Sequence, residues 1–212
     1  MLIYDTPSWL SAGTSGKGEQ LDDSRALGFG QPLALPRQTH SANVCRVAAS
    51  CRPDDTDAVF TDVPGLCLAV KTADCIPVLL YDHRNHTIAA IHAGWKGTVQ
   101  YIVQKTIAAM HSNGADLSAI IGPGISLQSF EVGDEVFERF QTEGFPMDLI
   151  ACRQEKWHID LWEANRWILQ QCGVSDIHIA GIDTMTSPHY YSARRETIAT
   201  GRNYNWIVIE KS

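Results

Sequence analysis

The segment His92-Ala93-Gly94-Trp95-Lys96-Gly97 joins the end of an apolar stretch to the start of a helical pattern. An imidazole in this position lies where a strand ends and a helix begins. Proteins of the α/β class often bind ligands there, because backbone donors converge outside the sheet. His92 is therefore a candidate site residue. The alternative is a histidine that only caps the turn through a hydrogen bond.

A thiol is the second candidate, at the end of Thr72-Ala73-Asp74-Cys75. Taken alone, Cys75 has the character of a small buried thiol. If residues 76–82 and 87–92 form a hairpin, however, the start of the first strand lies beside the end of the second. The hairpin would bring Cys75 close to His92.

Gln38-Thr39-His40-Ser41 supplies a second histidine in a stretch without helical period, so it can reach the same place or be a surface loop histidine. Two imidazoles and one thiolate suit Zn²⁺, and three protein ligands leave a fourth position for water or substrate. Copper also accepts such a set, although none of the four methionines is placed as a weak axial ligand. The eight histidines include no His-x-His pair, which excludes the trinuclear copper cluster of conventional multicopper oxidases.

Basic side chains gather late in the chain, at Arg194, Arg195 and Arg202. Planar guanidinium groups hold phosphate or carboxylate through two parallel hydrogen bonds, which makes this group a candidate anion site. The alternative is a solvated turn with surface ion pairs. Gly122-Pro123-Gly124 follows one strand pattern and precedes an expected helix, where backbone N–H groups can bind an anion, although a plain turn is the simpler interpretation.

The composition is that of an ordinary globular chain, with 212 residues of which 44% are hydrophobic and 19% charged. A domain of this length buries roughly 70% of the surface that its unfolded chain exposes, so it needs neither disulfides nor a structural metal. The net charge of -7 disfavours non-specific binding to nucleic acid or to an anionic membrane. We expect one domain over residues 1–212, with no nucleic-acid partner and no membrane partner.

The sequence shows no pattern typical of a membrane helix, a secretory signal or a disulfide scaffold. No apolar stretch approaches the roughly 20 residues of a membrane-spanning helix, and residues 1–5 lack the basic flank of a secretory signal. The six cysteines form no Cys-x-x-Cys pair and are too few for a disulfide scaffold. We therefore expect a cytoplasmic protein in which most cysteines are buried thiols.

Short segments rich in Val, Ile and Leu, separated by tight turns, come before the first long helical pattern. They predict strands of one antiparallel or mixed block over residues 56–62, 66–71, 76–82 and 87–92. Further strands are expected near 118–122, 176–181 and 206–210, and a loop over 11–32.

Two helices have clear sequence signals. Apolar side chains at helical spacing predict a helix over 98–111. Asp160 with Glu163 has the spacing of a capping box for a second helix, which Gly173 can end. Because four strands precede the first long helix, a simple doubly wound parallel sheet is disfavoured, and the predicted fold class is α/β with a mixed sheet.

With these motifs in this order, the chain resembles the bacterial YfiH-like laccase-domain proteins, a family of polyphenol oxidases and purine nucleoside phosphorylases, from about residue 33 onward. The resemblance rests on residues 38–40, 72–75, 92–97, 122–125, 130–132, 157–161, 192–195 and 200–202. It implies that His40, Cys75 and His92 form one metal site, usually occupied by zinc. It also implies a layered α/β sandwich with flanking helices, similar to the cysteine-histidine deamidase toxins.

The resemblance further implies an enzyme with purine nucleoside and phosphate as its partners. Our leading hypothesis is zinc-dependent phosphorolysis of adenosine, inosine, guanosine and methylthioadenosine, with deamination of adenosine in the same pocket. The three metal ligands are then catalytic as well. Phosphate would be held by Lys96, Arg194 or Arg195.

Three other hypotheses stay open. Copper in the same ligands would make the protein a laccase-like polyphenol oxidase. Without metal, Cys75 would be the nucleophile of a hydrolase with His92 as its base. The third is a binding protein without turnover.

The chain departs from the family pattern at three places. Ser11 to Gly18 replaces the usual N-terminal segment that contains Gly-Gly, Lys96 stands where Arg is common, and Asp183-Thr184 occupies a place often held by Cys-Thr. These departures bear on the substrate range rather than on the metal ligands.

Overall fold

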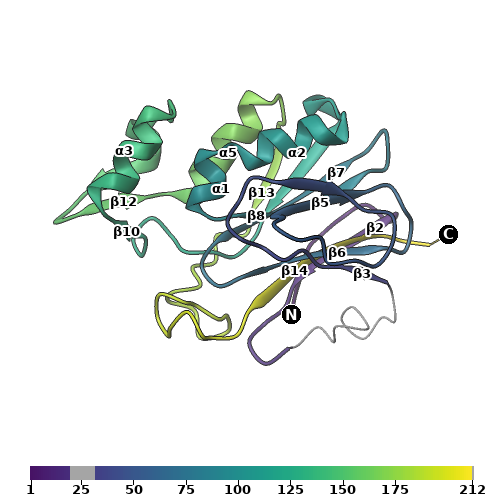
Figure 1. The fold of residues 1–212 in the computed structure, drawn as a ribbon, viewed down its shortest axis with the longest axis horizontal. Helices are drawn as coiled ribbons and strands as arrows, with labels where there is room; N and C mark the ends of the chain where they lie inside the picture. Colours follow the sequence, from purple (N-terminus) through teal and green to yellow (C-terminus); the bar gives the residue numbers. More distant parts are fainter. Residues whose placement is uncertain (20–31, 212) are drawn as a thin grey trace.

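Helices cover one face of a mixed β-sheet, and a second sheet packs against its other face (Figure 1). The computed structural model describes residues 1–19 and 32–211. The first sheet has the strand order β13-β9-β7-β8-β5-β4. Its strands are β4 (Val44–Arg46), β5 (Ala58–Thr61), β7 (Ile76–Asp82), β8 (Ile88–Ala93), β9 (Leu117–Ile121) and β13 (Asp176–Ile179).

The second sheet has the order β1-β2-β14-β6-β3 and lies below the first in Figure 1. Its strands are β1 (Leu2–Ile3), β2 (Leu10–Thr14), β3 (Leu33–Ala34), β6 (Cys67–Thr72) and β14 (Asn203–Ile209). The α/β class with a mixed sheet is confirmed, since parallel pairs such as β9 with β13 stand beside antiparallel ones such as β7 with β8.

Side chains of one strand alternate between two apolar layers, because successive residues point to opposite faces of a sheet. Along β7, Val78 and Leu80 lie in the layer under the helices, while Leu79 and Tyr81 lie between the two sheets. Ile207 of β14 belongs to the same layer between the sheets. Strands with both faces covered appear in a sequence as continuous apolar runs, as these do.

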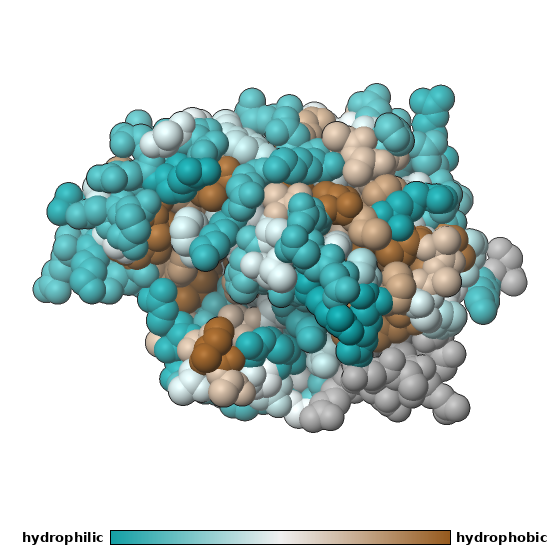
Figure 2. Space-filling model, in the orientation of Figure 1, coloured by the Kyte–Doolittle hydropathy of each residue, from teal (hydrophilic) through white to brown (hydrophobic). Residues whose placement is uncertain are grey.

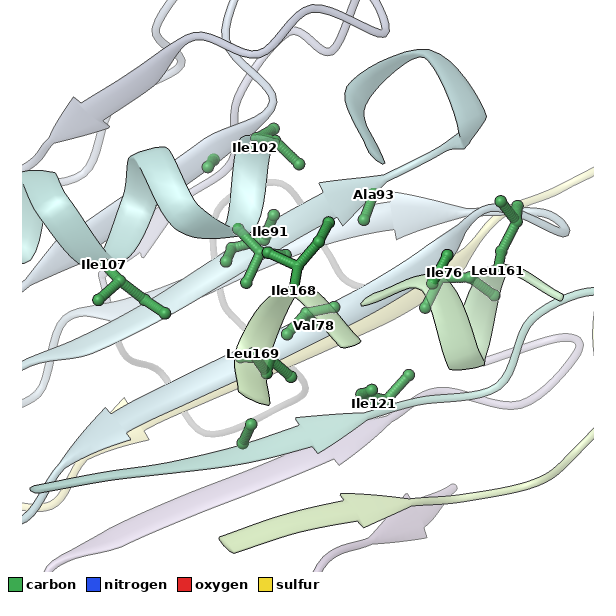
Figure 3. Packing of buried hydrophobic residues seen from close by; sticks show 14 of the residues in the cluster. Ile76, Val78, Ile91, Ala93, Ile102, Ile107, Ile121, Leu161, Ile168 and Leu169 are labelled. Carbon is green, nitrogen blue, oxygen red and sulfur yellow. The ribbon is translucent and has the colours of Figure 1, made fainter. Parts of the chain in front are cut away.

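The helical layer consists of α1 (Trp95–Val99), α2 (Ile102–Met110) and α5 (Leu161–Gln171). Figure 3 shows Ile102 and Ile107 of α2 beside Ile168 and Leu169 of α5, all packed over the sheet. Each such side chain contributes about 1.5–3 kcal/mol when fully buried. The capping prediction for α5 is confirmed: the Asp160 carboxylate accepts the backbone N–H of Glu163, and Gly173 follows the helix with φ 82°.

The prediction of one continuous helix over 98–111 is wrong, because the segment forms two helices, α1 and α2. Tyr101 has a left-handed backbone with φ 60°, and it separates α1 from α2. Its hydroxyl donates to the carbonyl oxygen of Glu143, and its ring stacks on Phe145. These contacts with a distant segment accompany the break, so the apolar periodicity alone could not reveal it.

A small arm consists of elements that the sequence did not predict. It comprises β10 (Glu131–Val132), α3 (Asp134–Thr142), α4 (Met147–Ile150), β11 (Ala151–Arg153) and β12 (Trp157–Ile159). Its three short strands form a separate sheet in the order β10-β12-β11, at the left of Figure 1. One 3-10 helix (Gly114–Asp116) precedes β9.

Most cysteines are not buried thiols as expected. All six lie in the described residues, and Cys67 alone is buried. The others keep some contact with solvent, because they lie on edge strands, on loops or at the end of α5.

Three other expectations need correction. The strand at 67–72 does not belong to the block with its neighbours, because β6 pairs with β14 and β3 in the second sheet. Residues 10–14 form β2 rather than loop, and residues 20–31 of that expected loop lie outside the described residues. No helix follows Gly122 to Gly124, where the N–H groups of both glycines donate to backbone carbonyls.

The surface is consistent with the charged composition. Figure 2 shows a mostly hydrophilic face on which apolar side chains form separate patches. Within residues 1–19 and 32–211, no helix has the length and apolarity that crossing a membrane requires.

Candidate metal centre and its pocket

The β7–β8 hairpin places Cys75 beside the end of β8, as predicted. Its register pairs Pro77 with His92 and Ile76 with Ala93, so the residue before β7 lies next to the residues that end β8. Asp74 has a positive φ of 90° just before the cysteine. This turn of the backbone starts the strand at the site.

The loop before β4 brings His40 to the same place. Its Nε2 lies 3.8 Å from the Cys75 sulfur, and its ring centroid lies 4.8 Å from that of His92. One ligand atom from each of the three residues lies within 4.8 Å of the other two. A tetrahedral zinc with ordinary bond lengths would separate sulfur from nitrogen by roughly 3.6 Å. The three residues, hereafter the His-Cys-His cluster, therefore form a metal-binding arrangement.

Gly94 allows the cluster to close. A Cβ atom at this position would lie 2.9 Å from the Cys75 sulfur and 3.1 Å from Cδ2 of His40. The backbone of Gly94 has φ -66°, which any residue can adopt. The glycine is needed here for space, because any side chain would push two candidate ligands apart.

A buried carboxylate lies behind the cluster. Asp57 is fully buried, and its Oδ1 lies 2.7 Å from Nδ1 of His92. Burial opposes the charged form of Asp57, but hydrogen bonds from His92 and from the N–H of Thr39 outweigh it and hold the pKa of the carboxyl well below its usual range. Since Nδ1 of His92 faces this carboxylate, Nε2 is left for a metal.

The two reactive groups of the cluster shift each other's protonation. Burial opposes a thiolate at Cys75, but the neighbouring imidazoles of His92 and His40 outweigh it and lower the pKa of the thiol to about 6. Burial also disfavours a charged His92, yet the Cys75 sulfur and Asp57 raise the pKa of this imidazole to about 9. The cluster therefore favours the thiolate, which is the form of cysteine that binds a metal.

The cluster opens onto a pocket of about 370 Å³, hereafter the basic pocket. Besides the cluster and Gln38, its walls are Arg37, Lys71, Ala73, Ala193, Ile198 and Arg202. Its volume lies in the range of small-molecule sites, roughly 300–1,000 Å³. Three cationic side chains next to a metal-binding arrangement suit an anionic ligand.

Gln38 joins the cluster to the second sheet. Its side-chain amide donates to the carbonyl oxygen of Lys71 at 2.7 Å and accepts the N–H of Lys71 at 2.8 Å. The side chain thus pairs with the backbone of β6 as a neighbouring strand would. This pairing holds the His40 loop against the strand that leads to Cys75.

The predicted phosphate ligands lie elsewhere. Lys96 stands on α1 with Nζ 5.7 Å from the Trp95 ring, and it does not line the basic pocket. The Arg194 guanidinium donates to the carbonyl oxygen of Glu131. The Arg195 guanidinium donates to the carbonyl oxygens of Thr184, Met185, Ser187 and Tyr190.

The loop that carries Arg195 explains why its guanidinium binds backbone carbonyls. The loop at 183–202, yellow-green to yellow at the lower left of Figure 1, directs several carbonyl oxygens inward, and a guanidinium with five N–H donors satisfies them together. The same loop contributes Ala193, Ile198 and Arg202 to the basic pocket. Arg195 therefore supports one wall of the pocket from within.

Arg37 and Lys71 also line the basic pocket, and sequence reasoning did not single them out; of the three late arginines that it grouped, Arg202 lines the pocket. Arg37 comes three residues before His40, and Lys71 four residues before Cys75. Their places directly before the two motifs that contain His40 and Cys75 were the available signal. It was weak, because single basic residues on an exposed loop and a strand usually mean solvated surface.

Two acidic residues connect the remaining motifs. The Asp74 carboxylate accepts the Thr184 hydroxyl and the backbone N–H of Arg194, each at 2.7 Å. Asp183 accepts the Ser126 and Ser129 hydroxyls. Asp183, which stands where the family often has Cys, thus binds the loop after β9 to the loop after β13.

The chain is similar to known proteins in sequence and in fold. The model of the family described as multi-copper polyphenol oxidoreductase laccase matches residues 19–210. A purine nucleoside phosphorylase from Bacteroides thetaiotaomicron is 45% identical over 201 residues, covering 85% of this chain and 74% of the relative. Adenosine deaminase RL5, from an unknown prokaryotic organism, is 36% identical over 194 residues, covering 82% of this chain and 74% of the relative.

Among solved structures, protein NMB0706 of Neisseria meningitidis has the same fold. Its TM-score is 0.85 at 29% sequence identity, and the match covers 99% of both chains. The layered arrangement that the motifs implied is thereby confirmed.

Proposed function

The chain belongs to the multi-copper polyphenol oxidoreductase laccase family, and we propose that it is a zinc-dependent purine nucleoside phosphorylase that also deaminates adenosine. One observation carries the proposal: the His-Cys-His cluster opens directly onto the basic pocket. The similar proteins named purine nucleoside phosphorylase and adenosine deaminase support this choice of substrate.

Zinc is the metal that this ligand set favours. A thiolate and two imidazoles with an open fourth position are the donors of a catalytic zinc site. No methionine lines the basic pocket, so the weak axial ligand typical of blue copper is missing from its described walls. Within the described part of the chain, this cluster is the one group of three or more His, Cys, Asp or Glu side chains that could bind a metal ion. Its three ligands are too few for a trinuclear copper cluster.

The residues of the chain have separate tasks in this proposal. His40, Cys75 and His92 hold the metal, which supplies Lewis-acid chemistry when bound. Arg37 holds phosphate by charge-assisted hydrogen bonds. Lys71 and Arg202 add positive charge to the pocket, and the Arg202 guanidinium also donates to the carbonyl oxygens of Ile198 and Gly201 in its own loop. Phosphate held there lies next to the cluster, where the bond between ribose and purine would be broken.

One observation favours a second candidate function. Cys75, His92 and Asp57 stand in the order nucleophile, base and orienting carboxylate, and the pKa of the thiol is lowered to about 6. A metal-free cysteine hydrolase would use this arrangement. It predicts that chelator-treated protein stays active and that alkylation of Cys75 abolishes the activity.

Product analysis tests the proposal. Metal-free protein and protein loaded with one equivalent of zinc or copper are incubated with adenosine, with and without phosphate, and the products are separated by chromatography. The proposal expects adenine and ribose 1-phosphate with zinc and phosphate, and inosine with zinc alone. Turnover only of phenols with copper would support a polyphenol oxidase, and activity only of the metal-free protein would support the hydrolase.

Replacing Arg37 by Ala should raise the KM for phosphate on the order of tenfold, because one charge-assisted contact in the pocket is lost. Deamination, which consumes no phosphate, should stay within about twofold, so the ratio of inosine to adenine should rise. Arg46→Ala is the matched control, since both arginines are exposed and each forms one ion pair with an aspartate. An unchanged KM for phosphate in the Arg37 variant would remove this residue from the phosphate site.

A further inference from the structure

Asp57 accepts hydrogen bonds from both histidine segments of the cluster. Its Oδ1 accepts the Nδ1–H of His92 at 2.7 Å and the backbone N–H of His40 at 3.1 Å. Its Oδ2 accepts the backbone N–H groups of Thr39 and Ser41, at 3.0 and 2.8 Å. The Ser41 hydroxyl also donates to Oδ2, at 2.8 Å.

The loop that this carboxylate binds has an unusual backbone. His40 has a φ of 63°, a left-handed conformation that non-glycine residues seldom adopt. Three consecutive N–H groups, those of residues 39–41, converge on Asp57 and compensate for this strain. Asp57 is fully buried, so solvent does not compete for its carboxylate oxygens.

We propose that Asp57 is the positioning residue of the zinc site: it holds His92 with the proton on Nδ1, so that Nε2 can bind metal, and it holds the His40 loop in its binding conformation. The inference rests on the zinc site of the proposed function. It goes further in assigning the placement of two ligands to one carboxylate that does not touch the metal. Carboxylates behind metal-binding histidines typically contribute 10- to 100-fold to metal affinity.

An asparagine of the same shape cannot replace it. If its oxygen faces His92, its NH₂ group meets the N–H groups of Thr39 and Ser41, and the loop loses its acceptor. If it is turned round, its NH₂ group faces Nδ1 of His92, and the imidazole must carry its proton on Nε2, the atom needed for metal. Either orientation damages one ligand.

Zinc affinity of the full chain, measured by competition with a chromogenic chelator, tests the proposal. Asp57→Asn should weaken zinc binding by about 10- to 100-fold. Asp82→Asn is the matched control, because Asp82 is also fully buried and accepts the backbone N–H groups of Arg84 and Asn85, at the other end of the β7–β8 hairpin. It should lower the thermal midpoint but keep the zinc affinity within about twofold.

A measurement on the unaltered protein decides the question even if Asp57→Asn does not fold. In ¹⁵N-labelled, zinc-loaded protein, long-range ¹H–¹⁵N spectra should show the His92 proton on Nδ1. Zinc bound through Nδ1 would overturn the proposal, as would an Asp57 variant whose zinc affinity is that of the wild type. Wild-type protein that binds zinc but forms neither adenine nor inosine from adenosine would overturn the proposed function and leave this inference standing.

Discussion

His40→Ala, Cys75→Ala and His92→Ala should each lower the affinity for zinc by on the order of a hundredfold or more. A structural zinc site with four protein ligands contributes about 10–16 kcal/mol of binding free energy, so the share of one ligand is on the order of 3 kcal/mol, which corresponds to roughly a hundredfold in affinity. Phosphorolysis and deamination should fall together in each variant, because both use the same cluster.

Zinc per chain after stringent dialysis, measured by atomic emission, is the readout. Cys152→Ala is the matched control, since Cys152 is also a free, partly exposed cysteine, on the distant strand β11. The thermal midpoint should change less than the zinc content. Full zinc retention in all three ligand variants would contradict the site.

Replacing Arg195 by Ala should reduce phosphorolysis and deamination alike, by at least about tenfold. Its guanidinium is the common donor to four carbonyl oxygens of the 183–202 loop, and a buried acceptor without a partner costs about 1–3 kcal/mol. The loop that loses this support carries Ala193, Ile198 and Arg202 into the basic pocket.

Arg194→Ala is the internal control for that experiment. The Arg194 guanidinium donates to one exposed carbonyl, that of Glu131, and its important contact, the backbone N–H to Asp74, survives the substitution. Both activities of this variant should stay within about threefold of the wild type. A selective rise in the KM for phosphate in the Arg195 variant, with deamination intact, would instead support the phosphate role that the sequence indicated.

The elements that local patterns determine are those with local causes. The β7–β8 hairpin follows from two apolar runs around a short turn, and it brings Cys75 beside His92. The start and end of α5 follow from the Asp160 carboxylate and from Gly173. Each of these features needs only residues that are close together in the chain.

Features with distant partners could not be derived in this way. Strand β6 does not pair with the strands next to it in the sequence but with β14, which lies more than 130 residues later. A strand buried on both faces shows no alternation of apolar and polar residues that would reveal its sheet. Tyr101 interrupts the helical pattern where it meets Glu143 and Phe145 of a separate segment.

The same distinction separates the cluster from its pocket. Cys75 and His92 are adjacent through one hairpin, whereas Arg37, Lys71 and Arg202 come from a loop, the second sheet and the 183–202 loop. Their convergence depends on how the two sheets pack and on which carbonyls the arginines satisfy, and both are long-range contacts. Chemical character is local, so residue types and spacing indicate the metal ligands, but the identity of the residues that face the ligand depends on the packed structure.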